Sequence, residues 1–331
     1  MNIYLTLDYE LFLSRTTGSI DRCLIEPMNE LCAIAKRYNV IFTIFVDAAY
    51  LYALKRFSNN NQVKRDYDNV CTNLQQLKKR GHEIQLHIHP QWFYANWNDE
   101  WILPQKYYKL SDLPDNDVRE LFKISKELLE EIIQDKIIAF RAGGFSAQPT
   151  SLLRELFLVN NIQIDSSVYP HGFYSSNYQT YDYSNAPDKD IYRFDSDICI
   201  EDRQGPFIEL PISGYKVPSA LYWRYAFNRL IKSKKHLIYG NGNSVPLNND
   251  SIVKRLTKRT DGLATIDGLK ISYLHAALKA KINSGDNHFC ILGHPKLATP
   301  YSLKNLESFC KNIPKMCSFS SISSLISYDE L

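Results

Sequence analysis

Short apolar segments alternate with longer segments of helical periodicity along most of the chain, and this alternation limits the fold more than any other feature. The apolar segments are rich in β-branched and aromatic residues, which favour strands. Between them, apolar residues recur every three or four positions, as Leu24, Met28 and Leu31 do. Strands that alternate with helices form parallel sheets. We expect strands at residues 2–8, 40–46, 82–89, 137–140, 162–165, 207–211 and 289–292, with a last short one near 317–319.

Seven or eight such strands with intervening helices are enough to build a barrel. The sequence therefore predicts an α/β fold, a distorted (β/α) barrel with about seven parallel strands. We expect residues 1–331 to form one domain, with loop insertions near 90–115, 169–205 and 212–285. Because barrels carry their chemistry at the C-terminal ends of the strands, candidate residues are sought there.

Composition excludes several classes of protein. A net charge of +3 is too small to argue for a nucleic-acid partner. The seven cysteines are scattered without a CxxC pair, which indicates reduced thiols and neither a disulfide framework nor a zinc-finger site. No run of 18 apolar residues exists and the first residues do not resemble a signal peptide, so we expect a cytoplasmic protein without a transmembrane segment.

Two carboxylates, Asp8 and Glu10, close the first expected strand. Residues two apart on a strand lie on the same face, so both side chains point to the same side. Adjacent carboxylates repel each other unless a metal ion or another cation stabilises them. A solvated strand end is the alternative interpretation.

Two histidines, His87 and His89, close the third expected strand in the same spacing. Two imidazoles that project together from a strand end supply half of a zinc site. A pair of surface histidines is the alternative, and it is less favoured because Pro90 ends the strand directly after them. His82 points to the opposite face and is expected to be structural.

Later strands also end in residues that can carry chemistry. Arg141, Asp165 and His294 end the fourth, fifth and seventh expected strands. Taken singly, each has an ordinary explanation as a surface arginine, a turn aspartate or a helix-start histidine. Their recurrence at successive strand ends favours a common site.

The ordered set of motifs resembles the polysaccharide deacetylase family, also called the NodB homology family or carbohydrate esterase family 4. The segment TLDYE at residues 6–10 is similar to the family's first aspartate motif, and GHEIQLHIH at 81–89 to its histidine motif. FRAGGF at 140–145, DSS at 165–167, FIELP at 207–211 and LGHP at 292–295 resemble its arginine motif, aspartate motif, penultimate strand and final histidine motif. The resemblance spans nearly the whole chain in the family's order.

The sequence departs from the family's pattern at two positions. Tyr9 stands where the second aspartate is usual, and Gln91 stands where a second metal-binding histidine is usual, four residues after His87. Glu10 and His89 would have to replace them. These departures resemble a divergent subgroup associated with surface-polysaccharide and O-antigen gene clusters.

The resemblance implies a divalent metal ion, in this family usually Zn²⁺, held by Glu10, His87 and His89. The ion would lower the pKa of its water and polarise the acyl carbonyl. Sequence spacing alone does not separate the base from the ligand, so Asp8 and Glu10 could exchange roles.

The resemblance also implies the remaining catalytic roles. Asp8 would be the general base, and Arg141 would keep Asp8 charged and oriented. His294 would be the general acid that protonates the leaving amine, with Asp165 tuning it. The reaction implied is a hydrolase reaction at a carbon–nitrogen bond, the removal of an acetyl group from an N-acetylated sugar.

Aromatic side chains near the expected strand ends suggest how a sugar binds. Rings offer flat apolar faces with polar edges, so we expect Trp92, Phe145 and Tyr169 to contact substrate. Anchoring of long loops onto the barrel is the alternative. Residues 221–236 mix aromatic and basic side chains, which fits either a plain amphipathic surface helix or peripheral contact with an anionic membrane. The expected substrate is a sugar nucleotide or a lipid-linked glycan.

Two other functions compete with the deacetylase. Tyr9 and Gln91 motivate a catalytically inactive carbohydrate-binding relative. A metal-dependent hydrolase of a small cyclic amide is the second alternative. It ranks lower because such barrels usually carry their HxH pair after the first strand, whereas this pair follows the third.

Overall fold

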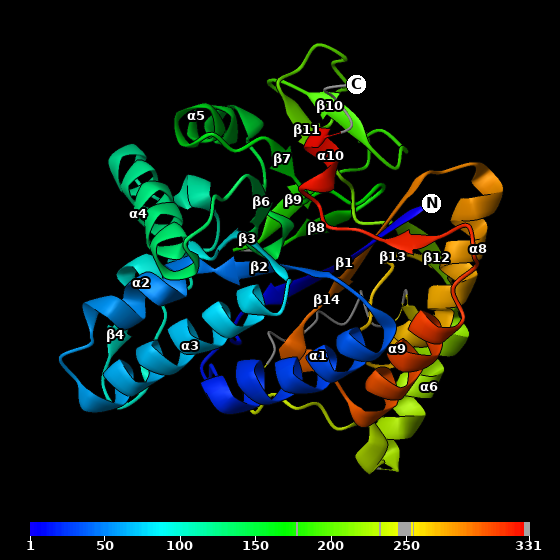
Figure 1. Ribbon diagram of the computed structural model, residues 1–331, viewed down its shortest axis with the longest axis horizontal. Coiled ribbons are helices and arrows are strands. Elements are labelled where there is room, and N and C mark those ends of the chain that lie inside the picture. Colours follow the sequence, from blue (N-terminus) through cyan, green and yellow to red (C-terminus); the bar gives the residue numbers. More distant parts are fainter. Residues whose placement is uncertain (177, 232, 244–252, 254, 328–331) are drawn as a thin grey trace.

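The computed structural model describes residues 1–176, 178–231, 233–243, 253 and 255–327. Its centre is a nine-stranded, mostly parallel sheet in the order β10-β11-β7-β6-β3-β2-β1-β14, with β15 paired to β1 (Figure 1). Only β10 runs antiparallel to its neighbour in this sheet. The strands are β1 Asn2–Tyr9, β2 Phe42–Asp47, β3 Glu83–Ile88, β6 Ala139–Ala142, β7 Ile164–Asp165, β10 Tyr192–Phe194, β11 Phe207–Glu209, β14 His288–Gly293 and β15 Ser318–Phe319. The predicted distorted α/β barrel is confirmed.

Helices cover the outer side of the curled sheet (Figure 1). The helices among the described residues are α1 Glu26–Tyr38, α2 Ala48–Arg56, α3 Asn61–Lys79, α4 Asp115–Ile133, α5 Thr150–Asn160, α6 Ser219–Leu230, α8 Leu274–Ser284, α9 Pro300–Lys311 and α10 Ser324–Ser327. The short helix α10 instead contributes Leu325 to the apolar cluster inside the sheet. Short helical turns are η1 Asp21–Ile25, η2 Pro90–Tyr94, η3 Leu110–Asp112, η4 Gly143–Phe145, η5 Lys234–His236, η6 Gly268–Tyr273 and η7 Pro295–Leu297. Within the described residues, no helix is both long enough and apolar enough to cross a membrane.

The alternation of side chains along each strand separates two cores. On β1, Ile3, Leu5 and Leu7 pack outward against the helices, whereas Tyr4 belongs to a second apolar cluster inside the curled sheet. The same period of two places Asp8 on the inner face, beyond Tyr4. The chemistry-bearing ends of the strands therefore stand above a packed apolar floor.

The barrel closes between β11 and β14 by an irregular segment, with no continuous strand ladder among the described residues. The Ser213 amide donates to the Cys290 carbonyl over 3.0 Å, and the Cys290 amide donates to the Ser213 hydroxyl over the same distance. Next to it, the Ile266 amide donates to the Leu292 carbonyl, and the Leu292 amide to the Ala264 carbonyl, both over 2.9 Å. Residues 264–267 are thereby fixed against the end of β14.

The three expected insertion regions carry small hairpins. Residues 90–115 contain β4 Asn96–Trp97 and β5 Trp101–Ile102, and residues 169–205 contain β8 Phe173–Ser175 and β9 Thr180–Asp182. Residues 212–285 contain β12 Gly214–Val217, β13 Thr260–Leu263 and α6. They shape the rim around the strand ends.

Candidate active site

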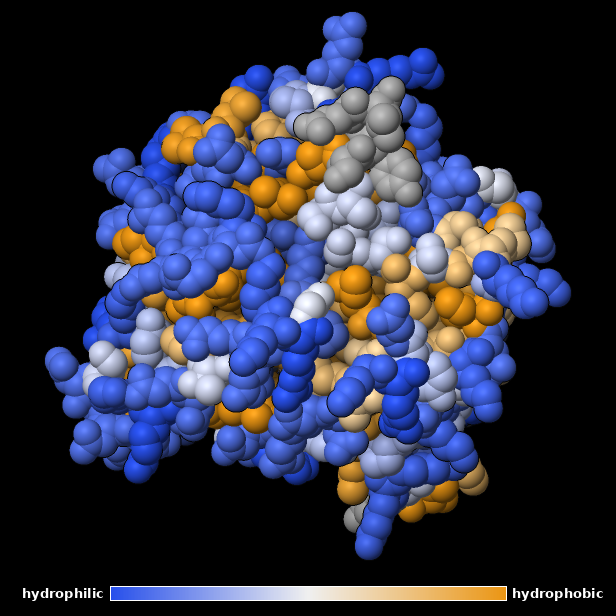
Figure 2. Space-filling view, viewed as in Figure 1, coloured by the Kyte–Doolittle hydropathy of each residue, from blue (hydrophilic) through white to orange (hydrophobic). Residues whose placement is uncertain are grey.

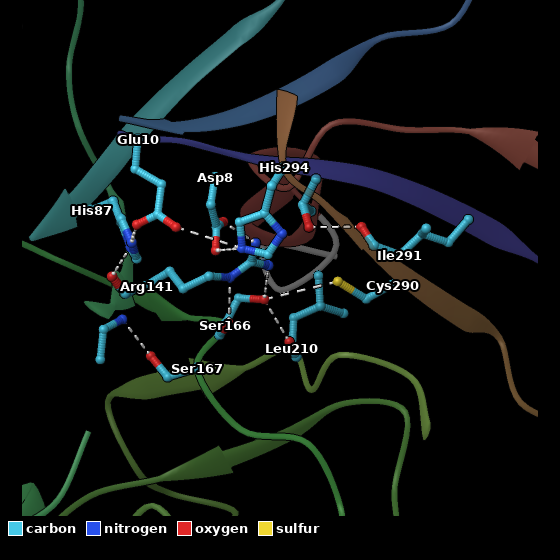
Figure 3. Close-up of polar contacts among 12 residues, drawn as sticks. Asp8, Glu10, His87, Arg141, Ser166, Ser167, Leu210, Cys290, Ile291 and His294 are labelled. Atoms are coloured by element: carbon cyan, nitrogen blue, oxygen red, sulfur yellow. Dashed lines mark hydrogen bonds and ion pairs between the residues drawn. The ribbon is translucent and has the colours of Figure 1, made fainter. Parts of the chain in front are cut away.

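The C-terminal ends of β1, β3, β6 and β14 meet around one pocket of about 250 Å³. Figure 3 shows Asp8, Glu10, His87, Arg141 and His294 gathered there from these strand ends. The pocket is lined by Asp8, Glu10, Phe12, Leu13, His87, His89, Tyr108, Ala142, Gly144, Phe145, Gln179, Asn243, His294, Lys296 and Leu297.

Glu10, His87 and His89 form a buried group that could hold a metal ion, since their ligand atoms all lie within 4.8 Å of one another. Glu10 Oε2 lies 2.5 Å from His89 Nε2 and 3.3 Å from His87 Nε2. On its other side, the His87 ring places Nδ1 2.7 Å from the Arg141 carbonyl oxygen. Because a carbonyl only accepts, Nδ1 carries the proton and donates. In neutral His87, Nε2 then keeps its lone pair for a cation.

Tyr9 points away from this group, as its position between two inward-facing carboxylates requires. Its hydroxyl donates to Asn73 Oδ1 on α3 over 3.0 Å. Glu10 is therefore the carboxylate that reaches the histidines.

Lys296 is a functional residue that sequence reasoning missed. Its ammonium is buried and donates to Glu10 Oε1 over 2.8 Å and to the Leu11 carbonyl over 2.7 Å. These two bonds leave Glu10 Oε2 turned toward the histidines. Burial would raise the pKa of Glu10, but Lys296 and the two histidines outweigh it and hold this pKa well below its usual range.

The surroundings of His87 favour the doubly protonated, charged imidazole. Burial would lower its pKa, but the carboxylates of Asp8 and Glu10 outweigh burial and raise the pKa to about 9. A metal ion can bind only if one of the two ring protons leaves, since metal ligation requires the neutral imidazole.

Arg141 fixes one oxygen of Asp8. Its Nη1 donates to Asp8 Oδ1 over 2.7 Å, while Nε and Nη2 donate to the carbonyl and hydroxyl oxygens of Ser166 over 2.7 and 2.9 Å. The guanidinium also stacks over the Phe45 ring, 4.2 Å from its centroid. Both charged side chains are almost fully buried, with 0% and 4% of their surface exposed. Asp8 is therefore held in one orientation.

His294 stands opposite Asp8 and is oriented by Asp267. Its Nδ1 lies 2.8 Å from Asp267 Oδ2, and its Nε2 faces the pocket at 3.7 Å from both Asp8 Oδ2 and Glu10 Oε1. The backbone amide of His294 donates to Asp267 Oδ1 over 2.9 Å. Burial would lower the pKa of His294, but Asp267, with the other carboxylates, raises it above its ordinary value.

Asp165 is expected to tune His294, but the carboxylate that contacts the His294 ring in the structure is that of Asp267. Asp165 accepts from the amide and hydroxyl of Ser167 over 2.8 and 3.0 Å and pairs in register with Glu209 across β7 and β11. Both carboxyl groups are fully buried. Burial raises the pKa of Asp165 to about 6, and burial with the Asp165 charge raises that of Glu209 well above its usual value.

The three aromatic residues expected to bind substrate have different surroundings. Trp92 is fully buried, with its ring 4.6 Å from Tyr50 and 5.3 Å from Trp101, and it is not among the residues that line the pocket. Phe145 lines the pocket. Tyr169 is partly buried and packs edge-on against Phe145 at 5.5 Å, behind the pocket wall.

Known proteins resemble this chain in fold and not in sequence. No protein-family model matches the chain, and no curated protein matches it. Three solved structures align with it at a TM-score of 0.52: a protein described as a polysaccharide deacetylase from Mycobacterium smegmatis, the allantoinase Puue, and another described as a polysaccharide deacetylase from Pseudomonas aeruginosa. The alignments cover 99% of this chain and 89%, 89% and 90% of those chains, at 14%, 11% and 12% identity. The chain has the fold of the polysaccharide deacetylases.

Proposed function

We propose that this protein is a metal-dependent hydrolase that removes the acetyl group from an N-acetylated sugar. The observation that carries the proposal is the convergence of Glu10, His87 and His89 in the same pocket as Asp8 and His294. Two structures of the same fold are described as polysaccharide deacetylases, which supports the substrate class.

The donor set fits a zinc-like ion. One carboxylate oxygen and two imidazole nitrogens are ligands that Zn²⁺ takes in catalytic sites, where further positions stay open for water and substrate. Such an ion, when bound, polarises an acyl carbonyl and lowers the pKa of water. Lys296 acts as a positioning residue, because its bond to Glu10 Oε1 leaves Oε2 for the ion.

The remaining residues divide the proton transfers between them. Arg141 holds Asp8 Oδ1, so Asp8 Oδ2 is the oxygen that faces the pocket and accepts a proton from the attacking water. As the carbon–nitrogen bond breaks, the departing amine needs a proton. His294 supplies it from Nε2, while Asp267 holds the other ring nitrogen. Asp8 and His294 therefore act as general base and general acid, which in enzymes contribute about 10²–10⁴-fold each.

Acetate release from a panel of N-acetylated sugars, sugar nucleotides and glycolipids tests the reaction, with metal content measured on the same samples. A double substitution of His87→Ala and His89→Ala should abolish both metal binding and acetate release while leaving the fold intact. His275→Ala, an exposed histidine on α8, is the matched control and should change neither. Equal metal in wild type and double variant would refute the site. Allantoin belongs in the panel, since one structure of this fold is an allantoinase.

Lys296 also supports a second candidate, a metal-free carbohydrate-binding protein. Its ammonium already neutralises Glu10, a task that a metal ion would otherwise perform. Such a protein would bind N-acetylated sugars but would purify without a stoichiometric divalent ion and would release no acetate.

A further inference from the structure

We propose that an apolar cavity next to the catalytic pocket binds the hydrocarbon chain of a phosphate-linked lipid whose sugar is the substrate. The inference rests on the proposed function and deepens it. Of the two expected substrates, it selects the lipid-linked glycan over the sugar nucleotide.

The cavity has a volume of about 830 Å³, more than three times that of the catalytic pocket. Its walls come from four parts of the chain: α6, η5 with the two residues that follow it, η6 and η7. They include Tyr225, Leu237, Ile238, Leu269, Leu297 and Thr299. Leu237 is 61% exposed and Ile238 is 38% exposed. A hydrocarbon chain in the cavity would remove this apolar surface from water, which is favourable in proportion to the area covered.

The cavity and the catalytic pocket share a wall. Leu297 lines both, and Asp267, which orients His294, also lines the cavity. A hydrocarbon chain bound in the cavity would therefore place the head group of its lipid close to His294.

Lys234 is a cation on the cavity wall, whereas burial and the neighbouring charges of Lys235 and Arg224 lower the pKa of His236, so that its imidazole is neutral. Lys234 and His236 line the cavity, and Lys235 places its ammonium 6.0 Å from the Tyr301 ring beside His236. Among the described lining residues Asp267 is the only carboxylate, and it is engaged by His294. A phosphate monoester or diester suits this charge distribution, whereas a sugar nucleotide has no hydrocarbon to fill the apolar walls.

Exposed apolar residues continue from the cavity along α6 and the turn that follows it. Trp223, Phe227, Leu230 and Ile231 are 59%, 62%, 80% and 54% exposed. Figure 2 shows apolar surface gathered at the lower end of the molecule, where α6 ends in Figure 1. This surface offers a route by which a lipid leaves a bilayer for the cavity. Lys232, which belongs to the basic and aromatic stretch at 221–236, lies outside the described residues.

Equilibrium dialysis of the full chain with radiolabelled farnesyl phosphate, kept below its micelle concentration, tests the inference. We expect saturable binding with one lipid per protein, and no displacement by inorganic phosphate alone. The double substitution Leu237→Asp with Ile238→Asp should weaken binding by about tenfold or more, since burying one leucine is worth at least that factor. Val159→Asp, at a 73% exposed apolar position on α5, is the matched control and should leave binding unchanged.

Charge is tested separately with the neutral alcohol farnesol. Lys234→Glu should weaken farnesyl phosphate binding and spare farnesol, while Lys123→Glu, at an exposed lysine on α4, should affect neither.

Three results would overturn the inference. They are no saturable farnesyl phosphate binding, equal binding by the Leu237/Ile238 variant, and binding only to phosphatidylglycerol vesicles. Loss of self-association in that variant without lipid binding would assign the surface to a second copy of the chain. The dialysis involves no turnover, so acetate release from water-soluble N-acetyl sugars still decides the proposed function if lipid binding fails.

Discussion

Replacing Arg141 by methionine should destabilise the fold by about 3–5 kcal/mol, the usual cost of leaving a buried charge without its partner. Methionine fills much of the arginine's volume, so the loss is chiefly electrostatic. The substitution strands the Asp8 carboxylate, of which 4% is exposed, and also removes two hydrogen bonds to Ser166. Against a typical stability of about 5–15 kcal/mol for a whole protein, that loss is large.

Arg154 supplies a control with the same ion-pair distance. Its Nε lies 2.7 Å from Asp195 Oδ1, the same separation as in the Arg141–Asp8 pair, but 40% and 30% of the two side chains are exposed. Water screens an exposed pair, so Arg154→Met should cost only about 0–1 kcal/mol. The difference between the two variants measures what burial and the bonds of Arg141 to Ser166 add to an ion pair of the same length.

A double variant completes the test. Asp8→Asn combined with Arg141→Met should be more stable than Arg141→Met alone, because no uncompensated charge remains. Urea unfolding followed by circular dichroism and tryptophan fluorescence gives the free energies, provided that the two probes coincide. The reasoning is refuted if Arg141→Met costs no more than Arg154→Met, or if the added Asp8→Asn brings no recovery.

Three further predictions concern the reaction and the buried carboxyl pair. Asp8→Asn should abolish turnover while elemental analysis still finds the metal; loss of the metal would make Asp8 a ligand and exchange its role with that of Glu10. His294→Ala should lower kcat by about 10²–10⁴ with little change in KM, and Asp267→Asn added to it should cost little more, because the two act as a unit. Additive losses in kcat would show that Asp267 acts independently of His294. Folded pKa values raised above the unfolded ones mean that Asp165 and Glu209 contribute stability at low pH that is lost as pH rises through the folded values, about 6 for Asp165. Glu209→Gln removes one of these groups, so its urea midpoint should fall less between pH 5 and pH 8 than that of wild type, and an unchanged slope would contradict the assignment.

The period of two along strands made much of the site predictable. Asp8 and Glu10, like His87 and His89, are separated by one outward residue that packs against helices, so their side chains emerge together at the strand ends. Residue type alone was a poorer guide. Trp92 follows the histidines closely in the sequence. Its indole is large and apolar, so burial removes much of its surface from water, and the ring is fully buried.

Two site residues gave no recognisable signal in the sequence. Lysine is almost never fully buried unless it is paired, so Lys296, two residues after His294, had no reason to be placed beside Glu10. Asp267 comes from residues 264–267, which touch β14 through a single β-bridge between Thr265 and Leu292. Contacts of that kind join distant parts of a chain without any periodic pattern that could reveal them.

The position of Asp267 limits how this protein could be re-engineered or could diverge. Residues 212–285 look like an exchangeable rim segment, since they connect β11 to β14. The same segment carries the carboxylate that sets the proton affinity of His294. Grafting a relative's loop in place of this segment would therefore also change the pKa of His294, the proposed proton donor. Only grafts that preserve residues 264–267 keep the carboxylate that contacts His294, so a change in this rim segment and a change in the surroundings of His294 go together.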